Sequence, residues 1–99
     1  MYRLNITKKA ERLLEKEIEY SRQNWGVKQA NKYKLGLKKA LKELSQNPKI
    51  YQVREEIGSH IRIKKYEGSQ IVYEISEEHN LVSILAVYGK NKLITAENL

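Results

Sequence analysis

Four basic residues in the second half of the chain have the side chains best suited to binding phosphate. Arg62 and Lys64 alternate with isoleucines in an expected strand, and Lys90 and Lys92 follow the apolar run Val82–Gly89. If the two strands flank a third, the polar face of the first and the corner after the last form one basic concavity. Cleavage of a nucleic acid there would also need a proton donor and a proton acceptor. A lysine with an ordinary pKa of about 10.4 is a poor base near neutral pH, so the sequence supplies cations but no evident base.

A second concentration of positive charge falls in residues 28–43. Residues 1–49 carry 13 Lys and Arg against 5 Glu (net +8), whereas residues 50–99 carry 6 against 7 (net −1). Lysines four apart in a helix repel one another slightly, and a purely structural face more often includes glutamates. We therefore interpret this lysine face as an electrostatic surface for an anionic partner, with a solvated face as the alternative. Its members are Lys28, Lys32, Lys34, Lys38, Lys39 and Lys42.

The other side chains that commonly do chemistry are poorly placed for it. His60 and His79 have no second histidine or carboxylate at ligand spacing, so we expect exposed turn histidines and no metal site. Glu55 and Glu56 are adjacent and would point in different directions, which argues against an acid–base pair. The chain has no glycine-rich phosphate loop and no serine elbow. We expect no cofactor.

Length and composition are typical of one folded domain, which we expect to span residues 1–99. The chain is 31% charged and 40% hydrophobic, and no apolar run approaches the roughly 20 residues that span a bilayer. The first residues lack the continuous apolar stretch of a secretory signal. There is no cysteine, which excludes disulfides and thiolate metal sites. The expected location is therefore the cytoplasm, away from membranes.

The first half of the chain has the period of a strand and then of two helices. Residues 2–6 alternate as in a half-buried strand, Thr7 can cap a helix, and Gly26 can end it in the left-handed conformation. We expect Trp25 to staple the helices to the sheet, with an exposed partner anchor as the alternative. Pro48 marks the end of a second helix. The first helix has a stripe of Ala10, Leu13, Leu14, Ile18 and Ser21, and the second has Val27, Ala30, Tyr33, Leu37, Ala40, Leu41 and Leu44.

The second half has the period of strands. Residues 61–64 and 71–75 alternate, residues 81–88 are nearly all apolar, and the EGS and EEHN segments (67–69 and 77–80) predict the turns between them. The apolar strand suits a central position in the sheet. The expected fold class is α+β, with the order β-α-α-β-β-β and an N-terminal helical hairpin packed on an antiparallel sheet.

A series of residues through the whole chain carries a family resemblance. A tryptophan–glycine pair is followed by an alanine, a tyrosine, spaced leucines and a proline, and then by REEI at 54–57, Arg62 and IVY at 71–73. This combination resembles the RelE/ParE toxin superfamily, and its ParE branch most closely. The residues of the first part are Trp25, Gly26, Ala30, Tyr33, Leu37, Leu41, Leu44 and Pro48.

The resemblance implies a toxin neutralised by an antitoxin from the same operon. RelE-like members cut messenger RNA on the ribosome with cations on the sheet and a C-terminal tyrosine, or with a Glu-Arg-His set. ParE-like members lack those sets and poison DNA gyrase. Here Gln70 and Asn91 stand where RelE-like nucleases carry arginines, and the tail ITAENL has no tyrosine or histidine. Tyr88 in turn stands where ParE proteins usually carry a histidine.

Three hypotheses follow from the resemblance. The first is a gyrase inhibitor, with target-binding residues Arg62, Lys64, Tyr88, Lys90 and Lys92. The second is a ribosome-dependent mRNA interferase with Arg62, Lys64 and Lys90 as catalytic residues. The third is a degenerate toxin that retains only antitoxin binding. In each case the expected partner is an acidic, amphipathic antitoxin segment, disordered when free, which wraps the helical hairpin and an exposed strand edge in a hetero-oligomer.

Overall fold

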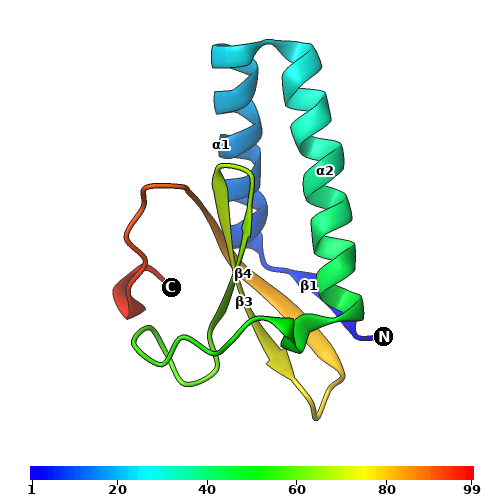
Figure 1. Cartoon of the computed structure of the whole chain (residues 1–99), viewed down its shortest axis with the longest axis vertical. Helices are drawn as coiled ribbons and strands as arrows, with labels where there is room; N and C mark the ends of the chain where they lie inside the picture. Colours follow the sequence, from blue (N-terminus) through cyan, green and yellow to red (C-terminus); the bar gives the residue numbers. More distant parts are fainter.

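Two helices stand on one side of a four-stranded sheet, and their hairpin rises beyond the end of the sheet (Figure 1). The computed structural model describes residues 1–99. Neither helix has the length and apolar content needed to cross a membrane. The elements in chain order are β1 (Arg3–Ile6), α1 (Lys8–Trp25), α2 (Val27–Gln46), the 3₁₀ helix η1 (Pro48–Ile50), β2 (Arg62–Tyr66), β3 (Ser69–Ser76), β4 (Leu81–Gly89) and the 3₁₀ helix η2 (Ala96–Asn98).

Helix α1 begins and ends at the residues that the sequence predicts. Thr7 is its N-cap, and the Thr7 hydroxyl accepts a hydrogen bond from the Ala10 amide at 3.2 Å. Gly26 ends it with φ +93° and ψ 169°. The positive φ confirms the need for glycine, but the extended ψ means that the left-handed helical conformation was the wrong expectation. Gly26 thereby also starts α2, because its carbonyl accepts from the Ala30 amide at 3.0 Å.

The apolar stripe of α2 packs on the sheet as predicted, except at its first residue. Leu37, Ala40, Leu41 and Leu44 are buried, whereas Val27 is 60% exposed. Val27 lies at the tip of the hairpin, beyond the reach of the sheet (Figure 1). A periodic pattern cannot show where a helix outruns the surface that it covers.

The sheet has the strand order β1-β4-β3-β2, so β4 is a central strand as predicted. Strands β2, β3 and β4 form the expected antiparallel meander. The fold class is as expected, but β1 departs from the expected antiparallel pairing, because it pairs with β4 in parallel, with Arg3 opposite Leu81. The chain between β1 and β4 runs through both helices and through β2 and β3, which is ample length for a parallel pairing.

Both faces of the sheet are covered. Ile71, Tyr73 and Ile84 face the helices and belong to the main core. Val72 and Ala86 face the other way, toward a second cluster with Ile94 of the C-terminal segment. The register shifts between Val72 and Tyr73, which leaves one extra residue on β4 and keeps apolar side chains directed at both faces.

Candidate binding surfaces

Arg62 and Lys64 lie on the helix-facing side of β2, where residues around Tyr51 occupy their polar groups. Arg62 donates hydrogen bonds to the backbone carbonyls of Tyr51 and Lys49. Lys64 Nζ donates to Tyr51 Oη at 2.8 Å and lies 5.0 Å from the centroid of that ring. Both cations therefore hold the segment after η1 against the sheet edge.

Lys90 and Lys92 lie in a tight corner at the end of β4. The Lys92 amide donates to the Gly89 carbonyl at 3.2 Å. The Gln70 side-chain amide donates to the carbonyls of Gly89 and Lys92 at 2.8 and 2.9 Å. Gln70, buried in the sheet, thus fixes the backbone of the corner and leaves both lysine side chains exposed.

Tyr88 connects the corner to the C-terminal segment. Its ring centroid is 5.7 Å from Lys92 Nζ, within cation–π range. Its hydroxyl donates to the Asn98 carbonyl, which also accepts from Lys9 Nζ. Tyr88 is therefore half-buried and tethers the C-terminal segment, with its ring beneath a lysine.

The structure does not bring all the predicted cations together. Arg62 lines a hollow of about 150 Å³ with Glu77, and Lys64 lines another of about 260 Å³ with Glu43. Lys90 and Lys92 line a third, of about 550 Å³. The expectation of one basic concavity was wrong, because the polar face of β2 points toward the helical layer and not toward the corner.

Helix α1 completes the hollow at the corner. It contributes Lys16, Glu17 and Tyr20, and Glu17 Oε1 lies only 3.6 Å from the position that a Cβ on Gly89 would take. We call Lys16, Lys90 and Lys92 the basic corner. The contribution of Lys16 and Tyr20 is not predictable from the sequence, because nothing local shows that the middle of α1 meets the end of β4.

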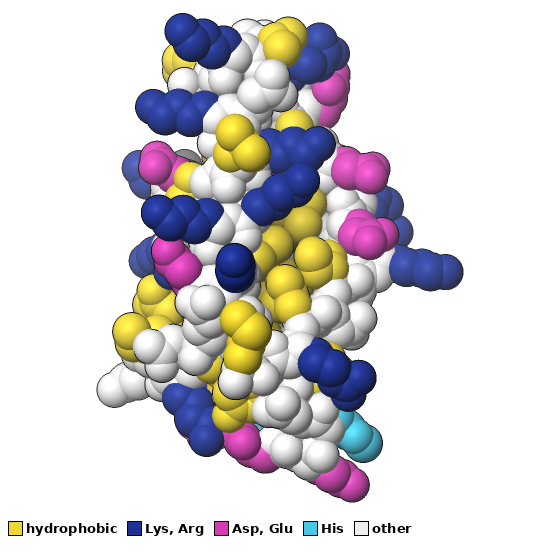
Figure 2. Space-filling view, turned by 90° about the vertical axis from the view of Figure 1, so that its right-hand side faces the viewer, with side chains coloured by type: hydrophobic (Ala, Val, Ile, Leu, Met, Phe, Trp, Pro, Cys, Tyr) yellow, Lys and Arg dark blue, Asp and Glu magenta, His cyan; other side chains and the backbone are white.

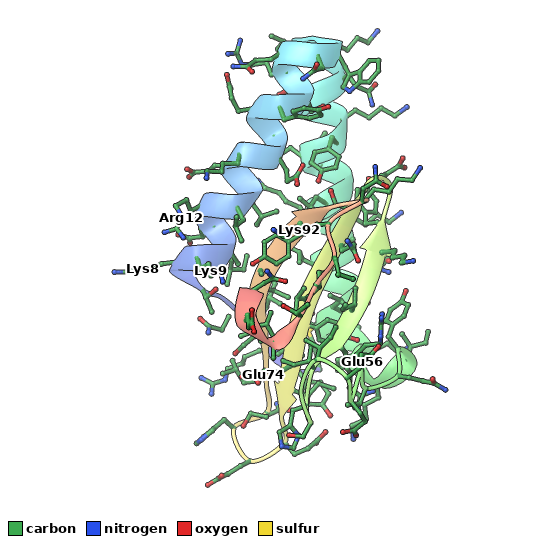
Figure 3. All side chains as sticks on the ribbon, turned by 90° about the vertical axis from the view of Figure 1, so that its left-hand side faces the viewer. Lys8, Lys9, Arg12, Glu56, Glu74 and Lys92 are labelled. Atoms are coloured by element: carbon green, nitrogen blue, oxygen red, sulfur yellow. The ribbon has the colours of Figure 1, made fainter.

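A basic ridge leads along α1 to this corner. Lys8, Arg12 and Lys16 are spaced by four, so they follow one side of the helix. Figure 3 shows Lys8, Lys9 and Arg12 together on the first turns of α1, on the side of the molecule that also carries Lys92. Lys8, Arg12 and Lys16, which form the ridge, are all exposed, and none has an ion-pair partner. The i, i+4 spacing was the signal that could have identified them from sequence.

Glu17 is the one carboxylate that lines both the hollow at the corner and a neighbouring hollow lined by aromatic residues. Partial burial raises the pKa of its side chain above the ordinary value for glutamate. Its neighbours in the hollow include the three lysines of the basic corner. A half-buried carboxylate beside cations is able to accept or donate a proton near a bound phosphate.

An aromatic hollow of about 290 Å³ adjoins the corner and shares Glu17, Tyr20 and Gly68 with it. The expectation that Trp25 staples the helices to the sheet was wrong, since Trp25 is 70% exposed. It is the last residue of α1, at the tip of the helical hairpin that rises beyond the end of the sheet (Figure 1). The aromatic residues of this hollow are Tyr20, Trp25, Tyr33 and Tyr66.

The six lysines of α2 are all exposed, but they do not form one surface. Lys34 and Lys38 border a groove between the helices, whereas Lys28 and Lys39 lie on the outward side of α2. Figure 2 shows this groove as a patch of hydrophobic side chains with basic residues on one side and acidic residues on the other. Its volume is about 340 Å³. This helical groove is lined by Ile6, Glu11, Leu14, Glu15, Ile18, Lys34, Leu37, Lys38 and Leu41.

The histidines lie as predicted, exposed and in loops or turns. His60 borders the hollow of Arg62 but has no carboxylate bound to it. No three His, Asp or Glu side chains lie close enough to hold a metal ion.

Residues 4–93 match the family described as the ParE toxin of type II toxin-antitoxin system, parDE. No curated protein sequence matches the chain. The chromosomal ParDE TA system from P. aeruginosa contains a similar chain, with a TM-score of 0.76 at 19% identity over 90% of this chain and 96% of that one. The isolated E. coli RelE toxin gives 0.62 at 22% identity, over 94% and 88%. The toxin-antitoxin complex RelBE2 from Mycobacterium tuberculosis gives 0.60 at 20% identity, over 89% and 96%.

Proposed function

This chain belongs to the ParE toxin family of type II toxin-antitoxin systems, and on that premise we propose that it arrests growth by binding DNA gyrase until an antitoxin neutralises it. The observation that carries the choice of gyrase is the separation of the predicted cations. An RNA-cleaving set built from Arg62, Lys64 and Lys90 needs all three around one phosphate. Here they line three different hollows, and the first two are bound to the Tyr51 segment.

The basic corner is the surface that we assign to the target. Its lysines are exposed, unpaired and held on a backbone that Gln70 fixes at two carbonyls. A rigid positive surface favours an acidic protein segment or DNA held by that protein. Arg62 and Lys64 then act in stability, and only Tyr88, Lys90 and Lys92 of the predicted target-binding residues lie at the corner.

The helical groove is the surface that we assign to the antitoxin. Solved relatives of this fold are described as a ParDE system and as a RelBE toxin-antitoxin complex, which supports a partner of this kind. An amphipathic segment would place its apolar side on Leu14, Ile18 and Leu37. Its acidic residues would face Lys34 and Lys38, and its basic residues would face Glu11 and Glu15 across the groove. The resulting complex is a hetero-oligomer.

The test combines purified toxin, gyrase, supercoiled plasmid and ATP, and measures the linear DNA released by protease. We expect linear DNA to accumulate with the toxin and to disappear when the antitoxin is added first. The double variant Lys90→Ala/Lys92→Ala should lose most of this activity. Lys39→Ala, which removes an exposed charge from the outward side of α2, is the control and should keep this activity. Toxin that arrests growth but yields no linear DNA would contradict the proposal.

One observation favours the alternative of a ribosome-dependent mRNA interferase. Glu17, with its raised pKa, lies in the same hollow as Lys16, Lys90 and Lys92, so a proton acceptor and cations do meet there. In that case the toxin should cleave mRNA on ribosomes, and Glu17→Gln should abolish cleavage while Lys64→Ala should not. A chain that binds antitoxin but is inactive in both assays would be a degenerate toxin.

A further inference from the structure

The basic ridge, the basic corner and the aromatic hollow are continuous on one side of the molecule. Lys8 to Lys16 extends about 12 Å along α1 at the rise of an α-helix. Lys16 then lines the hollow of the corner, and Tyr20, one turn further, lines both that hollow and the aromatic one. A line of cations therefore leads to a group of aromatic rings.

The rings at the end of this line are available for contact. Tyr20 is 61% exposed and Trp25 is 70% exposed, although both are large apolar side chains. Tyr66 is held against α2, where its ring centroid lies 6.1 Å from that of Tyr33. The hollow thus has two open rings and two fixed ones around a volume of about 290 Å³.

The charge of the lining also favours an anion. Lys16, Lys32, Lys90 and Lys92 line the two hollows, against Glu17 and Glu67. None of the four lysines is in an ion pair. The ridge adds Lys8 and Arg12 outside the hollows.

We propose that this surface binds a short stretch of single-stranded DNA, with phosphates along the cations and unpaired bases stacked on Tyr20 and Trp25. Cations that track a backbone beside exposed aromatic rings are the combination that binds single strands with little sequence preference. A duplex would use the cations alone, because its bases are already stacked. The choice of DNA over RNA rests on the proposed function, since gyrase holds cleaved DNA.

The test uses the purified full-length chain without gyrase. Trp25 is the only tryptophan, so its fluorescence reports on the aromatic hollow directly. We expect a thymidine strand of about 12 nucleotides at about 50 mM salt to change this fluorescence, and a duplex of equal length to bind at least tenfold more weakly. No fluorescence change, or equal binding of the duplex, would overturn the proposal. Tighter binding of a uridine RNA strand would overturn the choice of DNA.

Variants separate stacking from charge, with a labelled strand followed by anisotropy. Tyr20→Ala should weaken binding about tenfold, whereas Tyr20→Phe, which keeps the ring, should stay within about twofold. Lys16→Ala/Lys92→Ala should make the negative slope of log K against log salt concentration shallower by about 1.4. Lys39→Ala, on the outward side of α2, should change neither the affinity nor the salt dependence. Equal losses in Tyr20→Ala and Tyr20→Phe would contradict stacking, and thermal unfolding of each variant checks its fold.

The result is separable from the gyrase assay. Strand binding without gyrase poisoning would leave this inference standing and contradict the proposed function. Gyrase poisoning by a toxin that binds no strand would contradict this inference alone.

Discussion

The two flanks of α1 differ in the ligand that each can accept. Toward α2, Glu11 and Glu15 border the helical groove, whose base is apolar and whose two edges carry opposite charges. Toward the end of β4, Lys16 and Tyr20 border hollows lined by lysines and aromatic rings. The first flank suits an amphipathic peptide and the second suits an anion. One helix therefore borders both of the proposed binding surfaces, on two different sides.

This difference has a consequence for neutralisation. A segment that fills only the helical groove leaves the basic corner open, because the groove and the hollows of the corner share no lining residue. An antitoxin that blocks the target must therefore extend beyond the groove. If the two flanks are independent, a substitution in one should leave ligand binding at the other unchanged.

The largest effect is expected from Ile18→Gln in the helical groove. Ile18 is half-buried and lines the groove without belonging to the main core. Loss of a central apolar anchor should weaken antitoxin binding about 30- to 100-fold, measured by titration calorimetry. Binding of single-stranded DNA should not change. Ile50→Gln, the same substitution at a 66% exposed site outside the groove, is the control, and an equal loss there would contradict the assignment.

Gly36→Ala should disturb the aromatic hollow and leave the helical groove unchanged. A Cβ at position 36 would lie 1.7 Å from Tyr66 Oη, so the Tyr66 ring must move. Overpacking of about 1–3 kcal/mol, partly offset by the better helix propensity of alanine, should lower the free energy of unfolding by about 1–2 kcal/mol. Unfolding in urea measures this free energy. In a Tyr66→Ala background the same change should be neutral or stabilising, and an undiminished loss there would refute the contact.

Tyr73→Phe should lower global stability and leave both flanks unchanged. Tyr73 is fully buried, and its hydroxyl donates to the Pro48 carbonyl at 2.6 Å. The loss should be about 1 kcal/mol in the free energy of unfolding at neutral pH. Antitoxin and DNA affinities, measured well below the unfolding temperature, should stay as in the wild type.

The stability difference between Tyr73→Phe and the wild type should also depend on pH. Burial raises the pKa of Tyr73 to about 12, whereas the pKa of an unfolded tyrosine is about 10. Between these values the native chain keeps a proton that the unfolded chain has lost, so its stability falls as pH rises. Tyr73→Phe lacks this loss, so the stability gap between the two proteins should narrow from pH 10 to 12. A gap that stays constant would contradict the burial argument.

The smallest effect is expected from the lysines of α2. Lys34→Ala/Lys38→Ala removes two charges at the edge of the groove and should weaken antitoxin binding about three- to fivefold, with a reduced salt dependence. Lys28→Ala/Lys39→Ala removes two charges from the outward side and should change it less than twofold. Equal effects of the two pairs would mean that the whole lysine face binds the antitoxin. Affinity that is independent of salt would exclude a role for either pair.

Much of the architecture was predictable because its causes are local. Thr7 caps the helix that follows it, and the turns at Glu67–Gly68 and around Asn80 join strands that are close in sequence. The candidate site was only half predictable. Lys90 and Lys92 follow directly from an apolar strand and a glycine, but Lys16 and Tyr20 meet them from a helix more than sixty residues earlier.

The errors have one kind of cause. Trp25 was expected to be buried because tryptophan usually is, and only the length of the hairpin relative to the sheet leaves it exposed. Arg62 and Lys64 were grouped with Lys90 by charge, and only the strand register shows that they face Tyr73 and Ile71, on the helical side.

The order of the elements, the stripes that pack and the membership of the ParE toxin family all follow from the amino-acid sequence. These depend on periodicity, caps and turns, which act over a few residues. The tertiary structure alone decided the parallel pairing of β1 with β4 and the separation of the cations into three hollows. It also decided the meeting of α1 with the corner, because each of these depends on which surfaces, distant in sequence, pack against one another.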